Sequence, residues 1–205
     1  MDQKELYKIE KSDVDKCIIT LRDAFKHDPV WKEMVRDDPD KDKTLTGFFA
    51  VPVLCGMKFG KAYAISNQIE GLAVWAPGEK TYMNILGILI SGAMAYGSMI
   101  GKSSRKNLSI ISKYLNPDRK SNMKGKKYIH LLIIGVNSEN QGKGYGGKLL
   151  NKIIEECDKK GRYLYLETEL EENVRFYEKH GFQVIKKINI IELNVPMWEM
   201  VRAPK

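Results

Sequence analysis

Four glycines lie within the short segment of residues 136–148, VNSENQGKGYGGK. An apolar run leads up to this segment, and a stretch with the spacing of an amphipathic helix follows it. The first backbone N–H groups of a helix have no intrahelical acceptor and carry partial positive charge, so anionic oxygens bind there. Glycine places no side chain in front of these groups. The segment therefore predicts a binding site for a phosphorylated ligand.

The Walker A pattern fits this segment only in part. Gly142, Gly147 and Lys148 have the required spacing. The next residue is Leu149, where a Walker A loop has the serine or threonine that binds magnesium. The sequence therefore argues against a magnesium-dependent nucleotide site.

A dinucleotide-binding pattern fits better. Gly142, Gly144 and Gly147 have GxGxxG spacing, and Glu167 lies at the end of the next predicted strand, where a ribose ligand would be. The chain after Glu167 is too short for the remaining βαβ units of a doubly wound sheet. An NAD-type dinucleotide-binding protein is kept as an alternative.

A third pattern fits at every position. Residues 141–146, QGKGYG, match the Q/R-x-x-G-x-G/A loop that binds pyrophosphate in GNAT acetyltransferases. Residues 166–168 (LET) and 173–182 (NVRFYEKHGF) resemble the L-E-T and N-x-x-F-Y-E-x-x-G-F blocks of puromycin N-acetyltransferase-like members. Weaker similarity at residues 73–75 and 198–200 extends over most of the chain after about residue 70. The chain thus resembles a member of the GNAT superfamily.

The resemblance implies an α/β fold in which helices flank a central mixed β-sheet with splayed parallel strands. Residues 1–205 would form a single GNAT N-acetyltransferase domain. The implied activity is transfer of an acetyl group from acetyl-CoA (coenzyme A) to a primary amine of a small molecule or of a peptide, by direct attack in a ternary complex. The acceptor itself stays open, because one fold serves many acceptors.

The resemblance also assigns residues to the coenzyme. Its pantetheine arm would insert between the splayed strands and pair with the backbone at Ile134, Gly135 and Val136. Asn173 and Tyr177, four residues apart on one helical face, would contact the same arm. The pyrophosphate would bind the loop residues Gln141, Gly142, Lys143, Gly144, Tyr145, Gly146 and Gly147.

Acetyl transfer to an amine needs a base for the amine, a donor for the oxyanion and an acid for the departing thiolate. By resemblance, Tyr177 is the acid and a backbone amide near Val136 is the oxyanion donor. Glu167 and His130 both lie on predicted strands near the predicted cleft, so both are candidates for the general base. We rank Glu167 first and His130 second. A chain of water molecules is the alternative base. No metal site is expected.

The formal net charge is +8, and most of the excess lies in residues 102–127. We interpret this stretch as a solvated loop and helix face. Cys17, Cys55 and Cys157 have neither zinc-site nor disulfide-framework spacing, and the charged N-terminal residues lack the apolar run that is typical of a signal peptide. We expect a cytoplasmic monomer or homodimer that binds neither nucleic acid nor membranes. A non-catalytic module that binds acetyl-CoA or nucleic acid is the second alternative.

Residues 81–101, TYMNILGILISGAMAYGSMIG, carry no charge. The segment reaches the length of a membrane span only by including polar residues and four glycines. We therefore expect a buried helix or the wall of a pocket.

Hydrophobic periodicity predicts the elements that position these residues. Residues 128–136 are almost continuously apolar and should form the central strand. With the helix at 146–160 and the strand at 163–167 they form a βαβ unit, whose strands should be parallel. The other expected strands are 6–9, 61–66, 70–76, 183–188 and 195–201. One further helix is expected after residue 12, where Asp28-Pro29 should end it, a second after residue 42 and a third at 173–180.

Overall fold

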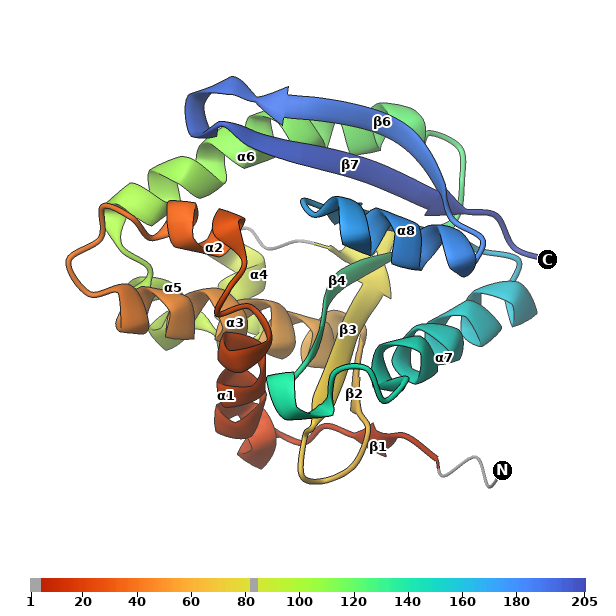
Figure 1. Ribbon diagram of the computed structural model, residues 1–205, viewed down its shortest axis with the longest axis horizontal. Helices are drawn as coiled ribbons and strands as arrows, with labels where there is room; N and C mark the ends of the chain where they lie inside the picture. Colours follow the sequence, from red (N-terminus) through yellow and green to blue (C-terminus); the bar gives the residue numbers. More distant parts are fainter. Residues whose placement is uncertain (1–4, 82–84) are drawn as a thin grey trace.

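Seven strands form one mixed sheet within residues 5–81 and 85–205, which the computed structural model describes (Figure 1). The strand order is β1-β2-β3-β4-β5-β7-β6. Neighbours are antiparallel except β4 and β5, which are parallel. The strands are β1 (Tyr7–Lys8), β2 (Lys61–Ala64), β3 (Gly71–Pro77), β4 (Tyr128–Val136), β5 (Tyr163–Thr168), β6 (Gln183–Ile190) and β7 (Val195–Arg202).

The structure confirms the expected mixed α/β sheet. β4 has the predicted bounds and is the fourth of the seven strands. The predicted hairpin is β2–β3, and the predicted C-terminal strand pair is β6–β7. Of this pair, β7 lies next to β5 and β6 forms the edge.

Helices cover both faces of the sheet (Figure 1). Leu149 and Ile153 of α7 pack in one core cluster with Trp75 of β3. Leu72 and Val74, which alternate with Trp75 along β3, pack in a second cluster with α1 and α3 on the opposite face. The helices are α1 (Val14–Ala24), α2 (Pro29–Met34), α3 (Lys41–Phe59), α4 (Ile85–Ile90), α5 (Met94–Met99), α6 (Lys102–Asn122), α7 (Tyr145–Lys159) and α8 (Glu171–Lys179).

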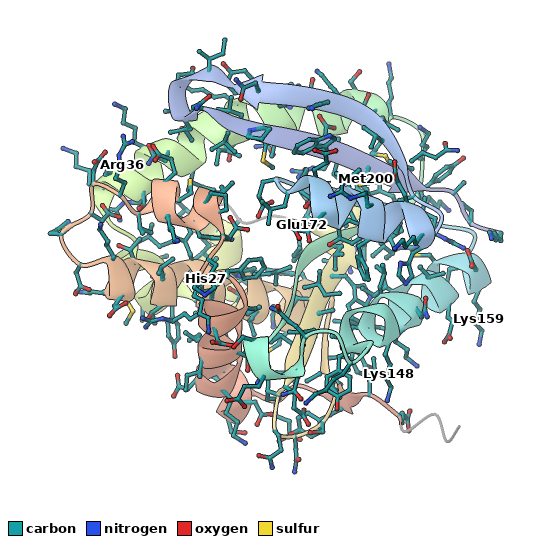
Figure 2. The ribbon with its side chains drawn as sticks, viewed as in Figure 1. His27, Arg36, Lys148, Lys159, Glu172 and Met200 are labelled. Atoms are coloured by element: carbon teal, nitrogen blue, oxygen red, sulfur yellow. The ribbon has the colours of Figure 1, made fainter. Side chains whose placement is uncertain are left out.

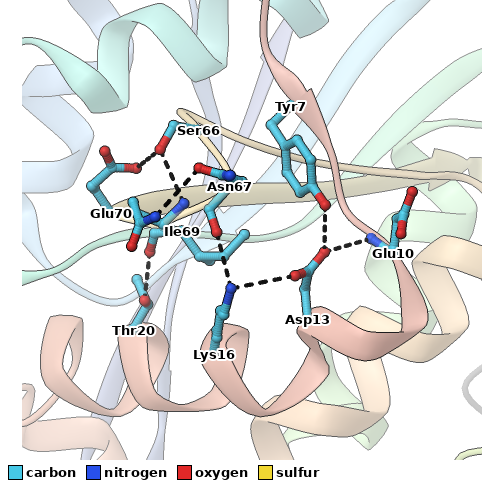
Figure 3. A network of polar contacts seen from close by, with 10 residues as sticks. Tyr7, Glu10, Asp13, Lys16, Thr20, Ser66, Asn67, Ile69 and Glu70 are labelled. Carbon is cyan, nitrogen blue, oxygen red and sulfur yellow. Dashed lines mark hydrogen bonds and ion pairs between the residues drawn. The ribbon is translucent and has the colours of Figure 1, made fainter.

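Polar contacts hold α1 against the first strands (Figure 3). Asp13 accepts hydrogen bonds from the Tyr7 hydroxyl at 2.9 Å and from the Glu10 amide at 3.0 Å. About two turns further along, in α1, the Thr20 hydroxyl donates to the carbonyl of Ile69 at 2.5 Å. These bonds attach both halves of α1 to β1 and to the β2–β3 turn, so α1 is fixed along the sheet.

The sequence Asp28-Pro29 ends the first helical segment, as expected, but it also begins α2, which we did not predict. A carboxylate oxygen of Asp28 accepts from the amides of Val30 at 2.8 Å and Trp31 at 3.4 Å. Proline fits the first helical position because its missing N–H would have had no partner there. The same dipeptide thus stops one helix and caps the next.

The uncharged segment at 81–101 does not form the buried helix that we expected. It contains two six-residue helices, α4 and α5, while residues 82–84 lie outside the described residues. Ile85 and Leu86 are largely exposed, whereas Ile88 and Ile100 line a cavity. The expected pocket wall is therefore present, and the expected burial is wrong: Gly92, with φ of 77°, lies between two short helices that leave large apolar side chains exposed. Among the described residues, no helix has the length and hydropathy to cross a membrane.

The basic segment forms one long helix, α6, followed by a turn and loop at residues 123–127, in agreement with the expected loop and helix face. Lys102, Arg105 and Lys106 are exposed, in agreement with the expected solvated face. The opposite face carries Leu115, which is buried, and Arg119, which turns toward the sheet. This second face places α6 over one side of the site described next.

Candidate active site

β4 and β5 separate along their length. Their parallel pairing begins with Tyr128 opposite Tyr163 and ends with His130 opposite Tyr165. β4 continues to residue 136 and β5 to residue 168 without further pairing between them. The splayed parallel strands expected from the resemblance are thus observed. A cavity of about 710 Å³ adjoins the gap, with Ile134 among its lining residues.

Six successive amides, those of residues 142–147, donate to no acceptor among the described residues. They run through the glycine loop, which we define as residues 141–147, into the first turn of α7. The chain returns to helical bonding at Lys148, whose amide donates to the Gly144 carbonyl at 3.0 Å. Since α7 starts at Tyr145, the positive end of its dipole lies here. The loop therefore has the donors and the field of an anion site.

Backbone conformation explains two of the glycines. Gly142 and Gly144 have φ of 78° and 80°, which strains any residue with a Cβ. The Gln141 side-chain amide donates to the Val136 carbonyl at 3.0 Å and ties the loop to the end of β4. Lys148, near the start of α7, projects from the same end of that helix (Figure 2).

The glycine loop lies beside α8. A Cβ at Gly146 would be 3.6 Å from the Phe176 ring, and a Cβ at Gly147 would be 3.5 Å from His180 Nε2. Lys143, in contrast, is exposed. A Cβ at either position would be in ordinary van der Waals contact, so α7 begins directly against the helix that carries Tyr177.

Ile134 and Gly135 occupy different environments on β4. Ile134 lines the cavity, as expected for a residue near the coenzyme arm. A Cβ at Gly135 would come within 2.9 Å of Leu21 and 3.2 Å of Ala24. Packing thus explains why residue 135 is a glycine, which the sequence did not suggest: without a Cβ there, α1 can lie directly on β4. Its contact with a coenzyme stays a prediction, as do those of Ile134 and Val136.

Asn173 and Tyr177 both line the cavity from α8. The Tyr177 side chain is buried, yet its hydroxyl forms no hydrogen bond with a described residue. Burial and the nearby carboxyl group of Glu169 raise the pKa of Tyr177 above its ordinary value. The phenol therefore keeps its proton at neutral pH, and the part of the chain that the structure describes offers no acceptor for it.

Glu167 and His130 meet across the end of the β4–β5 ladder. His130 Nε2 lies 2.7 Å from Oε2 of Glu167, and Arg119 of α6 donates to the other carboxylate oxygen at 3.0 Å. Burial raises the pKa of Glu167, but the charges of His130 and Arg119 outweigh it and hold the value below normal. An ionised carboxylate only accepts, so Nε2 carries the ring hydrogen, and Nδ1 has no partner among the described residues.

A second buried carboxyl group, that of Glu199, lies near the His130–Glu167 pair. Glu199 of β7 accepts from the Tyr165 hydroxyl at 2.9 Å and from the Asn122 side chain at 3.1 Å. Burial raises the pKa of Glu199, and that of Tyr165 is raised first by burial and then by Glu167 and Glu199. Tyr165 connects Glu199 to the His130–Glu167 pair, because its ring centroid lies 5.3 Å from that of His130 and its hydroxyl also interacts with Glu167.

Glu169 and Asp28 form a carboxyl pair at the mouth of the gap. Glu169 lines the cavity one residue beyond β5, and Asp28 is the buried cap of α2. Burial and the hydrogen-bonded Asp28 raise the pKa of Glu169 to about 8. The pair therefore holds a proton at neutral pH and fastens α2 to the end of β5.

The far side of the cavity is apolar. Its aromatic side chains contact one another, with ring centroids of Trp31 and Phe48 5.5 Å apart and those of Phe25 and Trp31 5.8 Å apart. They come from the end of α1 and from α2 and α3, and aliphatic side chains of α4 and α6 complete the wall. We call this region the apolar chamber and define it by Phe25, Trp31, Phe48, Ile88, Leu108 and Ile111.

The sequence identified the glycine loop, His130, Glu167, Asn173 and Tyr177 but missed Arg119 and the Glu169–Asp28 pair. Arg119 belongs to the basic segment at residues 102–127, and no sequence pattern around it distinguishes it from the other basic residues there. Glu169 follows the LET block directly, one residue beyond β5, and its closeness in the chain to Glu167 was a usable signal.

The comparisons with known proteins agree with this geometry. The model of the acetyltransferase (GNAT) domain family matches residues 114–184. An uncharacterised N-acetyltransferase of Schizosaccharomyces pombe is 28% identical over 205 residues, covering 97% of this chain and 83% of its own length.

Solved structures extend the likeness to almost the whole chain. The structure described as histone acetyltransferase HPA2 and related acetyltransferase, from Corynebacterium glutamicum, superposes with a TM-score of 0.66 at 20% identity, over 98% of this chain and 96% of that one. The chain has the GNAT acetyltransferase fold. Arylalkylamine N-acetyltransferase 2 of Aedes aegypti shares the GNAT fold, with a TM-score of 0.64 at 17% identity over 98% and 99% of the chains.

These comparisons bear on the resemblance to the GNAT superfamily and do not distinguish between its subfamilies. The GNAT domain match covers the glycine loop, the site strands and α8. None of the relatives named above is a puromycin N-acetyltransferase, so the narrower resemblance, which depends on residues 166–182, stays a prediction. The single-domain boundary at 1–205 also stays a prediction.

Proposed function

We propose that this protein is an acetyl-CoA-dependent N-acetyltransferase that acetylates a primary amine of a small molecule by direct attack in a ternary complex. The observation that carries the proposal is the series of six unpartnered amides at residues 142–147, directly beside the helix that presents Tyr177. The family match over residues 114–184 supports the same activity.

The residues present fit coenzyme A. The loop amides and the dipole of α7 suit its diphosphate, and the unpaired stretches of β4 and β5 suit the amide groups of its arm. Asn173 offers a side-chain amide in the same gap. When bound, acetyl-CoA supplies an acetyl group activated as a thioester.

Tyr177 is proposed as the acid that protonates the departing sulfur. Its raised pKa keeps the phenol protonated, and its hydroxyl is free of protein acceptors among the described residues. A phenol buried in a wall of the cavity can donate without competition from water.

The His130–Glu167 pair is proposed as the base. Glu167 ranks first by sequence, and the 2.7 Å contact of its Oε2 with Nε2 of His130 holds the ring in place, while Nδ1 is buried and has no partner among the described residues. Arg119 holds the other oxygen of the same carboxylate and keeps it ionised. Glu167 thus positions His130, and the two groups act as one unit in removing a proton from the amine.

The decisive experiment measures release of free coenzyme thiol from acetyl-CoA across a panel of small amines, together with thermal shifts by acetyl-CoA and NADH. We expect amine-dependent thiol release and stabilisation by acetyl-CoA alone. Stabilisation by NADH without effect of acetyl-CoA would favour the dinucleotide alternative. Salt-sensitive binding of nucleic acid without turnover would favour the binding module.

A further inference from the structure

The two ends of the cavity differ in polarity, and this difference bears on the acceptor. The charged side chains that line it among the described residues are Arg119, Lys120, His130, Glu167 and Glu169. All belong to β4, the end of β5 or the C-terminal half of α6. The apolar chamber at the other end contributes no charged side chain. A ligand that fills both ends must therefore be polar at one end and apolar at the other.

The carboxylates of the polar end already have partners within the protein. Glu167 is held by Arg119 at 3.0 Å and by His130 at 2.7 Å. Glu169 shares a proton with Asp28, because burial and that neighbour raise its pKa to about 8. One proton shared by two carboxyl groups leaves one negative charge at the polar end, whereas the six side chains that define the apolar chamber carry none. A second ammonium group placed among those six side chains would therefore leave water without a counter-charge.

The chamber walls offer few groups for recognition through hydrogen bonds. They consist mainly of apolar helix side chains; the exceptions are the indole Nε1 of Trp31, which has no partner among the described residues, and the Ser112 hydroxyl. A peptide backbone placed there would lose its bonds to water without replacing them. Contacts with Trp31, Phe48 and Ile111 instead favour hydrocarbon or aryl groups by removing their surface from water.

We propose, on the basis of the function proposed above, that the acceptor is a small primary monoamine with a single alkyl or aryl-alkyl tail, whose amino group lies at the His130–Glu167 end and whose tail fills the apolar chamber. The chamber determines acceptor specificity, and the polar end performs the chemistry.

The experiment compares kcat/KM by thiol release for ethylamine, butylamine, hexylamine, phenethylamine, 1,4-diaminobutane and spermidine. Within the n-alkyl series, we expect kcat/KM to rise about fourfold for each added methylene until the chamber is full. Phenethylamine should exceed 1,4-diaminobutane by at least about 100-fold.

A designed reversal sharpens the test. Leu108 lines the cavity yet is 42% exposed, so Leu108→Glu should fold while adding a carboxylate to the chamber. We expect kcat/KM to fall about tenfold for phenethylamine and to rise about tenfold for 1,4-diaminobutane. Leu86→Glu is the matched control, because Leu86 is exposed on α4 and does not line the cavity.

The outcomes separate the two proposals. Thiol release with diamines as good as monoamines, or an alkyl series with constant kcat/KM, would overturn the monoamine proposal and leave the N-acetyltransferase intact. A Leu108→Glu enzyme with unchanged preference would overturn it as well. Absence of thiol release with every amine would overturn the proposed function and the acceptor class together.

Discussion

The glycine loop and the apolar chamber are two halves of one site that are built in opposite ways. The loop consists of consecutive residues, and its donors are backbone amides whose positions follow from Gly142, Gly144 and the start of α7. The chamber consists of side chains from five helices, between Phe25 at the end of α1 and Ile111 in α6. Backbone recognition needs a local motif, whereas side-chain recognition of a hydrocarbon needs only a surface of suitable shape and polarity.

This difference determines how each half should respond to substitution. A single change in the loop can misalign several amides at once, so its effect on coenzyme binding should be large. The chamber spreads its contribution over many contacts, so single changes there should alter acceptor preference more than overall activity. The predictions below test this contrast, beginning with the residue where the two halves meet.

Tyr177→Phe should lower kcat by a factor on the order of 100 to 1,000, because it removes the proposed acid while keeping the buried ring. KM values for acetyl-CoA and amine should change little. Steady-state kinetics with a thermal unfolding control measures this. Tyr163→Phe, on β5 outside the cavity, should be neutral. Full kcat in a folded Tyr177→Phe enzyme would eliminate the acid role.

Gly144→Val should raise KM for acetyl-CoA roughly 50-fold at nearly unchanged kcat, because a β-branched residue cannot hold φ of 80° and the amides would shift. Gly125→Val is the matched control, since Gly125 has φ of 75° and equally free space around its Cβ but lies outside the loop. Both variants should lose stability, and only Gly144→Val should lose coenzyme affinity. Equal KM values for both would remove the loop from the coenzyme site.

Glu167→Gln should lower kcat/KM about tenfold and change its pH profile, because it removes the ionised carboxylate that contacts His130 and Arg119. His130→Gln should change the profile in a similar way. The measurement is kcat/KM across pH for both variants and the parent enzyme. Profiles that coincide for all three proteins would reject the pair as the base and favour water.

Glu169→Gln should have the smallest effect and act through stability. The folded chain binds the proton of Glu169 more tightly than the unfolded chain, so its stabilisation is complete below the ordinary pKa of 4.5 and is lost as pH rises to about 8. The variant should therefore gain roughly 3 °C in Tm above pH ~8 and have a flatter pH dependence. Glu172→Gln, an exposed change on α8, is the control. Parallel Tm curves would contradict the shared proton.

The elements that position the chemistry were largely predictable. β4 agrees with its predicted bounds, and α7 and β5 agree within one residue at each end. Each has a strong local period, and the βαβ order makes β4 and β5 parallel. α2 was missed because Asp28-Pro29 was interpreted only as a stop, and the burial of residues 81–101 was wrong because apolar composition does not reveal what covers a segment.

The sequence by itself determined the glycine loop, the central sheet and the positions of Glu167, Asn173 and Tyr177 relative to them. Those features depend on residues that are neighbours in the chain, or three to four apart on a helix, where local geometry is decisive.

Only the tertiary structure decided which partners these residues have. Arg119 reaches Glu167 from 48 positions away, and Asp28 reaches Glu169 from the other end of the chain. The apolar chamber likewise exists only where five helices converge. Contacts of this kind depend on packing directions that no local pattern encodes, so the charge state and selectivity of the site emerge only in the folded molecule.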